Sequence, residues 1–176
     1  MDERMQETEV REYTFDDDGR IPNNPTLPLL VYSQALVTSD LYPPSRCKEL
    51  FAENGWGGAW VDGVFSYHHY HSNAHEVLCV VGGSASIALG GPEGEMVEVE
   101  AGDVVVIPAG VGHCNKGSNG GFSVVGAYPR GQESYDLRTG EEGERPEVLQ
   151  NIRNVSLPKS DPLFGERGLL LQRWSG

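Results

Sequence analysis

The sequence predicts an all-β protein: a single jelly-roll barrel with one or two short helices outside it. Three observations lead to this fold class. Short apolar runs, most of them alternating with polar residues, follow one another from Trp56 to Pro129, as in a meander of antiparallel strands. The 23 glycines and 11 prolines are spread along the chain, which favours many turns. A length of 176 residues suits one domain with a sizeable core.

The first third of the chain predicts a tail, a strand and a helix. Residues 1–10 predict an acidic N-terminal tail, so that residues 11–176 form the single domain. Residues 27–32 predict a short apolar strand bounded by prolines. Residues 45–54 predict a helix, because they follow two prolines, carry an apolar face and end at the cap signal Asn54–Gly55.

The barrel strands follow from alternation. In residues 84–89 and 96–100 apolar side chains occupy every second position, which predicts one buried face for each strand. The glycine-rich residues 90–94 predict the turn between them. Residues 104–107 are a continuous β-branched run, typical of a buried strand, and residues 122–128 predict a further strand.

Two segments near the C-terminus predict structure outside the barrel. Residues 146–155 begin with proline and carry an apolar stripe, which predicts a short helix. Residues 168–174 are largely apolar and are expected to pack on the barrel. The sequence shows no internal repeat, so we expect one barrel unit and not two.

Charge and cysteine content exclude several classes of function. Thirteen basic against 26 acidic residues give a formal net charge of −13. This charge repels phosphates and anionic lipid, so we expect no nucleic-acid and no membrane partner. The three cysteines form no CxxC pair and no signal peptide is visible, which predicts a reduced, cytoplasmic setting. A small-molecule substrate is the expected partner, and homodimer formation is left open.

Four side chains have the spacing of a metal site. His69 and His71 are two residues apart in the extended-looking stretch 65–71, so both imidazoles project from the same face of a strand. Glu76 follows after a short polar break and places a carboxylate on the next strand of a hairpin. His113 comes from a separate segment. Three imidazoles and one carboxylate predict a site for one divalent ion of Fe, Mn, Ni, Zn or Cu.

The residues between these ligands follow the same alternation. Phe65 and Tyr67 share the face of the two histidines, so they are expected to line the barrel interior. The Tyr67 hydroxyl is a candidate catalytic group, with simple filling of the barrel as the alternative. His68 and Tyr70 are expected to face outward.

The sequence leaves open where the side chains of two further residues point. His75 lies in the break before Glu76, where its direction is open. It is an alternative ligand, a residue behind the ligands, or a surface residue. Asn115 shares the alternation of His113 and is a candidate for touching a substrate.

The same residues resemble the two sequence motifs of the cupins. The first motif is a glycine, an HxH pair, a glutamate and a second glycine, and residues 63–83 match every defined position. The second is a glycine, a PxG turn, a histidine and an asparagine. Residues 102–113 match it, but Gly117 stands where the asparagine is expected, with Asn115 two residues earlier. More narrowly, the chain resembles the small single-domain cupins labelled YjlB-like. The phrases that carry this likeness include 17–24, 54–56, 68–72 and 126–129.

The resemblance implies a double-stranded β-helix barrel, with its motifs in residues 56–129, and a metal held by His69, His71, Glu76 and His113. It implies no settled reaction. With a redox metal the site suits a dioxygenase-type oxidoreductase, in which Glu76 and Tyr67 are candidate catalytic residues. Two alternatives stay open: non-redox isomerase, epimerase or lyase chemistry, and a non-catalytic module that binds a metal or a small molecule.

Overall fold

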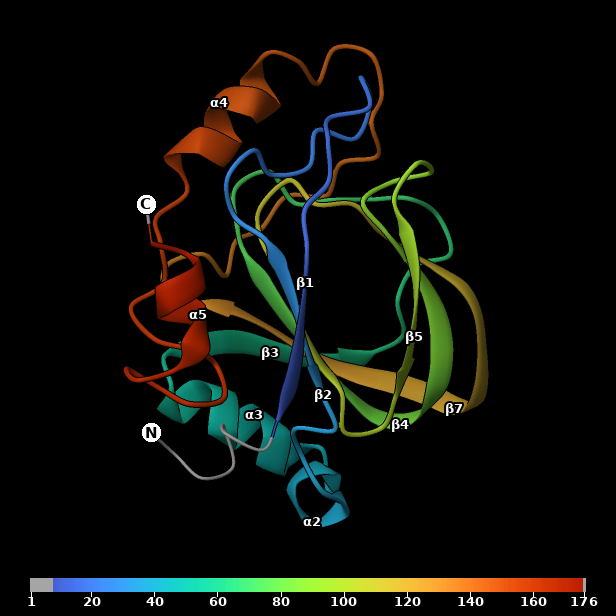
Figure 1. The fold of residues 1–176 in the computed structure, drawn as a ribbon, viewed down its shortest axis with the longest axis vertical. Coiled ribbons are helices and arrows are strands. Elements are labelled where there is room, and N and C mark those ends of the chain that lie inside the picture. The colour runs from blue at the N-terminus through green and yellow to red at the C-terminus, as the bar shows by residue number, and fades with distance from the viewer. Residues whose placement is uncertain (1–7, 176) are drawn as a thin grey trace.

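The computed structural model describes residues 8–175, and its main element is an antiparallel seven-stranded sheet that curls into a barrel (Figure 1). Its strands are β1 (Glu9–Tyr13), β2 (Leu29–Ser33), β3 (Trp56–Asp62), β4 (Glu76–Leu89), β5 (Glu95–Glu100), β6 (Val104–Ile107) and β7 (His113–Pro129). The order across the sheet is β1-β2-β6-β4-β7-β3, and β5 pairs with β4. The predicted all-β jelly-roll class is confirmed.

Strands β4 and β7 are longer than the alternation predicts. The expected strand that carries Glu76 and the expected strand at 84–89 form one strand, because pairing with β7 continues through Gly82 with shifts in register. Gly83 has a positive φ of 68°, a conformation that glycine adopts at little cost, so the strand bends here without ending. The strand expected at 122–128 is only the second half of β7.

Both faces of the sheet are buried. On β4, Val77 and Cys79 belong to a core cluster that also holds side chains of three helices, whereas Leu78 and Val80 belong to a cluster inside the barrel. This alternation explains why buried strands such as β6 are apolar at every position. Glu76 has the parity of Leu78, so its carboxylate points into the barrel.

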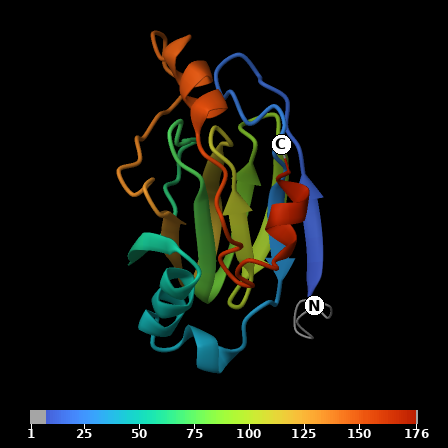
Figure 2. The ribbon, with the colours of Figure 1, turned by 90° about the vertical axis from the view of Figure 1, so that its left-hand side faces the viewer.

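The described residues contain four short helices, against the one or two predicted. They are α2 (Thr38–Leu41), α3 (Ser45–Glu53), α4 (Glu147–Asn154) and α5 (Leu169–Arg173). The predicted helices are α3 and α4, while α2 and α5 are too short to show a helical period. Figure 2 shows α3 and α5 on the same side of the sheet. Buried Leu170 and Trp174 confirm that the end of the chain packs on the barrel.

Two residues of the predicted N-terminal tail belong to the sheet. Residues 9 and 10 begin β1, where Glu9 pairs with Ser33 and Val10 with Tyr32. Residues 1–7 of the predicted tail lie outside the described residues. Among residues 8–175, no helix has the length and apolar character needed to cross a membrane.

Candidate metal centre

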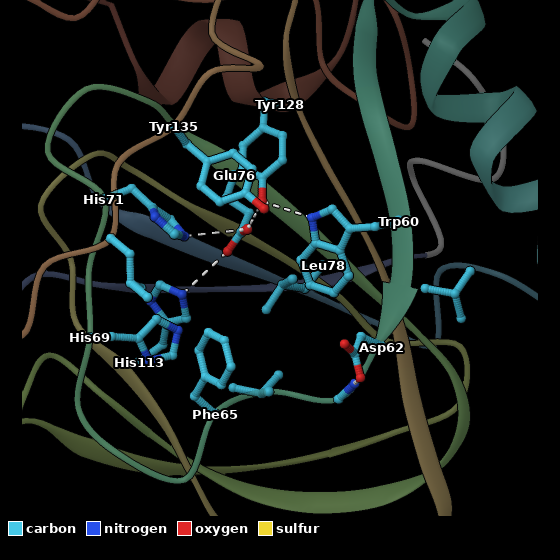
Figure 3. Close-up of a pocket in the computed structure, with 14 residues that line it drawn as sticks. Trp60, Asp62, Phe65, His69, His71, Glu76, Leu78, His113, Tyr128 and Tyr135 are labelled. Carbon is cyan, nitrogen blue, oxygen red and sulfur yellow. Dashed lines mark hydrogen bonds and ion pairs between the residues drawn. The ribbon is translucent and has the colours of Figure 1, made fainter.

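All four predicted metal ligands line one pocket. The pocket has a volume of about 480 Å³ and opens into the barrel interior between β3, β4 and β7 (Figure 3). His69, His71, Glu76 and His113 are all buried. Figure 3 shows the three imidazoles turned toward the Glu76 carboxylate.

The histidine pair is positioned by a bridge and not by a regular strand. Residues 63–68 form no strand, so the strand expected over 65–71 is wrong for its first part. His69 instead forms an isolated bridge with His113, in which each backbone N–H donates to the carbonyl of the other, at 3.2 and 2.9 Å. This bridge brings the two imidazole centroids to 4.0 Å. Tyr70 bridges Arg138 in the same way.

Each imidazole is held through the same ring nitrogen. Nδ1 of His69, His71 and His113 lies within hydrogen-bond distance of a backbone carbonyl oxygen. The partners are Tyr67 at 2.9 Å, Asp136 at 2.5 Å and Val111 at 3.1 Å. A carbonyl oxygen only accepts, so Nδ1 must carry the proton and Nε2 of a neutral ring keeps its lone pair. Metal-binding histidines are oriented in this way, so the residues present suit a metal ion.

Glu76 lies among these Nε2 atoms. Its Oε1 is 3.3 Å from His113 Nε2, and its Oε2 is 3.5 Å from His71 Nε2. Burial would raise the pKa of Glu76, but the two imidazoles hold it well below its usual value. Burial would likewise lower the pKa of His71, but the carboxylate raises it above 6.5.

The four residues are not equally close together. Ligand atoms of His71, Glu76 and His113 lie within 4.8 Å of one another. His69 stands beside this trio, with its ring centroid 6.1 Å from that of His71. Burial and the neighbouring His113 imidazole lower the pKa of His69 to about 3, so its ring is neutral at physiological pH. Ligation by these four residues stays a prediction.

The expectation that Phe65 and Tyr67 both line the interior is wrong for Tyr67. Tyr67 is 44% exposed, and its ring stacks on Phe65 with the centroids 5.0 Å apart. Alternation does not apply because residues 63–68 are not a strand. Phe65 does line the pocket, at its mouth. A catalytic role for Tyr67 stays a prediction, and its ring reaches the site only by its contact with His69.

His75 and Asn115 do not line the pocket. His75 is buried on the other side of the sheet, where its Nδ1 accepts a 2.9 Å hydrogen bond from the Ala109 N–H and its ring lies 4.8 Å from Trp174. The Asn115 side chain accepts a hydrogen bond from the Gly117 N–H at 2.9 Å. Asn115 and Gly117 both lie within β7, so this hydrogen bond spans a shift in the pairing of β7 with β4.

The alternation of apolar and polar residues did not identify Tyr128 as a residue of this site. Its hydroxyl donates to Glu76 Oε2 at 2.7 Å and accepts the Trp60 indole N–H at 2.8 Å. Burial and then the Glu76 carboxylate raise the pKa of Tyr128 far above its usual value, so the hydroxyl stays protonated. Tyr135 stacks on Tyr128 with centroids 4.2 Å apart. The parity of residues 122–128 places Tyr128 on one face, but only the pairing of β4 with β7 brings it to Glu76.

Comparisons with known proteins agree with this architecture. A family model described as "Cupin" matches residues 63–137. The chain is 45% identical over 168 residues to the Bacillus subtilis (strain 168) protein "Uncharacterized protein YjlB", covering 96% of this chain and 98% of that protein. It is also 31% identical over 92 residues to the "13S globulin basic chain" of Fagopyrum esculentum, covering 51% of this chain and 46% of that protein. Among solved structures, the acireductone dioxygenase from Bacillus anthracis is similar at a TM-score of 0.38 and 18% identity, covering 73% of this chain and 82% of that chain.

Proposed function

Because the chain belongs to the cupin family, we propose that it is a metal-dependent oxidoreductase of the dioxygenase type, with one divalent ion held by His69, His71, Glu76 and His113. The observation that carries the proposal is the shared orientation of the imidazoles. Every Nδ1 is engaged by a backbone carbonyl, so every Nε2 is left for a metal. When bound, a redox-active iron, copper or nickel ion would supply the electron transfer that dioxygen chemistry requires.

The pocket can hold a substrate, and the Glu76 carboxylate can hold a proton. The pocket of about 480 Å³ has the size of a small-molecule site, and its walls are mainly apolar and aromatic. Glu76 is ionised at neutral pH and can accept a proton from a substrate hydroxyl or an acidic C–H. Tyr128 holds Glu76 Oε2 through its hydrogen bond, so the oxygen that would take that proton is Oε1, which lies 3.3 Å from His113 Nε2.

The Tyr128–Glu76 pair also favours a second candidate, a non-redox isomerase or lyase. A buried carboxylate base beside a permanently protonated hydroxyl is an arrangement for proton abstraction and return. A zinc or manganese ion would then serve as a Lewis acid. Glu76 and Tyr128 would have the same roles toward the proton in both reactions, so metal identity separates the two candidates.

The test is purification without chelators, followed by elemental analysis and oxygen-electrode assays with phenols, enediols and thiols. We expect close to one iron, copper or nickel ion per chain and oxygen consumption with at least one of these classes. Stoichiometric zinc or manganese without oxygen consumption would favour the isomerase or lyase. Substoichiometric metal in every preparation, including protein reloaded with each ion, would contradict both.

A further inference from the structure

The pocket separates polar from apolar side chains. In Figure 3 the three histidines and Glu76 lie together at one side, and Trp60 lies at the other. Between them the walls are apolar or aromatic, with Leu78 at the base and Tyr135 beside Tyr128. A ligand that fills this space therefore meets the metal-binding atoms at the histidine end and apolar surface along its body, with the Asp62 carboxylate away from that end.

The charge of the lining excludes anionic groups on that body. Of the 14 described residues that line the pocket, only Glu76 and Asp62 carry a formal charge, and both are acidic. None of the 14 is lysine or arginine, the residues that usually pair with carboxylates and phosphates. A divalent ion with one carboxylate ligand leaves a single positive charge at the histidine end. One ionised oxygen of the ligand balances that charge, and a second anionic group would have no cationic side chain to face.

Apolar side chains line the mouth of the pocket. Val61, Phe65, Tyr135 and Leu137 line it, and each is between 40% and 50% exposed. They come from β3, from the segment after it and from the segment after β7, so three separate parts of the chain converge here. Exposed apolar side chains that converge on one opening indicate a ligand surface.

Ring stacking holds the aromatic walls of the pocket in place. Tyr135 stacks on Tyr128 at an interplanar angle of 21°, and Phe65 stacks on Tyr67 at 14°. Tyr135 also meets the His71 ring edge-on at 4.9 Å. Rings held in this way lose little freedom when a further flat ring packs against them.

We infer that the pocket takes an aromatic or similarly flat molecule that carries one ionisable hydroxyl and no carboxylate or phosphate: the phenol and enol class. The hydroxyl lies at the histidine and Glu76 end, and the ring lies against Phe65 and Tyr135. This inference rests on the proposed function for the presence of a metal at that end.

A matched pair of probes tests the inference with protein loaded with zinc, which supports no redox turnover. The probes are 2-naphthol and 6-hydroxy-2-naphthoate, which share one ring system and one hydroxyl and differ in a carboxylate at the far end of the rings. Calorimetric titration is expected to show 2-naphthol binding about tenfold more tightly or better, since the metal end balances one ionised oxygen and the added carboxylate meets no cationic side chain. Equal affinities, tighter binding of 6-hydroxy-2-naphthoate or undetectable binding of 2-naphthol would overturn the inference.

Variants at the pocket mouth provide a second test. Leu137→Lys supplies the missing cation and is expected to narrow the difference between the probes by raising the affinity for 6-hydroxy-2-naphthoate. Leu157→Lys, at an exposed leucine outside the pocket, is the matched control and should change neither affinity. Phe65→Ala should weaken 2-naphthol binding about tenfold, whereas Tyr42→Ala, at an exposed site outside the pocket, should leave it unchanged. Unchanged affinities in both pocket variants, or the same changes in the control variants, would contradict the assigned position.

Failure of the ligand class is distinguishable from failure of the proposed function. Zinc binding and probe affinity involve no oxygen, so they test the ligand class alone. Oxygen consumption by the iron- or copper-loaded protein tests the oxygenase. Tight 2-naphthol binding without oxygen consumption by any loaded form would support the ligand class and count against the oxygenase.

Discussion

The Tyr128 hydroxyl donates a 2.7 Å hydrogen bond to Glu76 Oε2, and so joins the end of β7 to the start of β4. His113, at the opposite end of β7, lies 3.3 Å from the other oxygen of the same carboxylate. Both ends of a 17-residue strand therefore reach one side chain. This is possible only because the paired strands curl round and close the barrel at Glu76.

Tyr128→Phe is expected to weaken metal binding by about tenfold, because Glu76 loses the hydrogen bond that orients it. Competition with a chromogenic chelator measures the dissociation constant. Tyr42→Phe, at an exposed tyrosine away from the pocket, is the control. An unchanged affinity in Tyr128→Phe would mean that this hydrogen bond does not prepare Glu76 for a metal.

His69→Ala and His113→Ala are each expected to lose most of the bound metal, because each removes an Nε2 ligand. His68→Ala should keep it, since His68 does not line the pocket. Elemental analysis of the three purified proteins decides the matter. Retention in His69→Ala together with loss in His113→Ala would reduce the ligand set to the closer trio that includes His71 and Glu76.

Stripping the metal is expected to lower the melting midpoint at neutral pH, because an ion bound only by the folded state stabilises it. The difference should shrink at mildly acidic pH, since a proton competes with the metal for the His71 ring. The Glu76 carboxylate raises the pKa of this ring, so the competition begins above its usual value of about 6.5. His69, with a pKa of about 3, stays neutral over this range.

Thermal melts of loaded and stripped protein at both pH values provide the measurement. Identical midpoints at neutral pH, in a sample shown by elemental analysis to be loaded, would contradict the assigned ligands.

His75 is expected to make the protein less stable as the pH falls. Burial lowers the pKa of His75 from 6.5 to about 4, so between these values the unfolded state binds a proton that the folded state excludes. The loss of unfolding free energy begins as the pH drops below about 6.5 and amounts to at most about 1.4 kcal/mol per pH unit.

Urea unfolding of metal-stripped protein from neutral to mildly acidic pH measures this slope. His75→Gln keeps an acceptor for the Ala109 N–H and should show a shallower slope than the unchanged protein. Two parallel slopes would show that His75 does not titrate in this way.

Asp161→Ala is expected to destabilise the protein by roughly 3 kcal/mol, because several buried donors lose their acceptor. The fully buried carboxylate accepts hydrogen bonds from the Tyr32 hydroxyl at 2.5 Å and from the Leu163 and Leu170 N–H groups at 2.8 and 3.2 Å. These bonds fasten the C-terminal segment to β2. Chemical unfolding measures the effect, with exposed Glu166→Ala as the control; equal stabilities of the two variants would contradict this role.

The local sequence pattern correctly predicted those strands and helices that have the same environment along their whole length. The alternation of 84–89 and 96–100 predicted their buried faces, since a strand with one face in the core must place apolar residues at every second position. The caps and apolar stripes of α3 and α4 likewise predicted those helices. Residue type and spacing also identified the four candidate ligands, which the structure places in one pocket.

Tertiary structure decided what depends on pairing between distant segments. Residues 63–68 have the composition of a strand but form no regular strand pairing, and Tyr67 is exposed there. Tyr128 came to Glu76 because β7 pairs with β4, a register that no local pattern encodes. The sequence by itself therefore determined which side chains are available for the site. The closure of the barrel decided which hydroxyl holds the carboxylate and which rings form the walls.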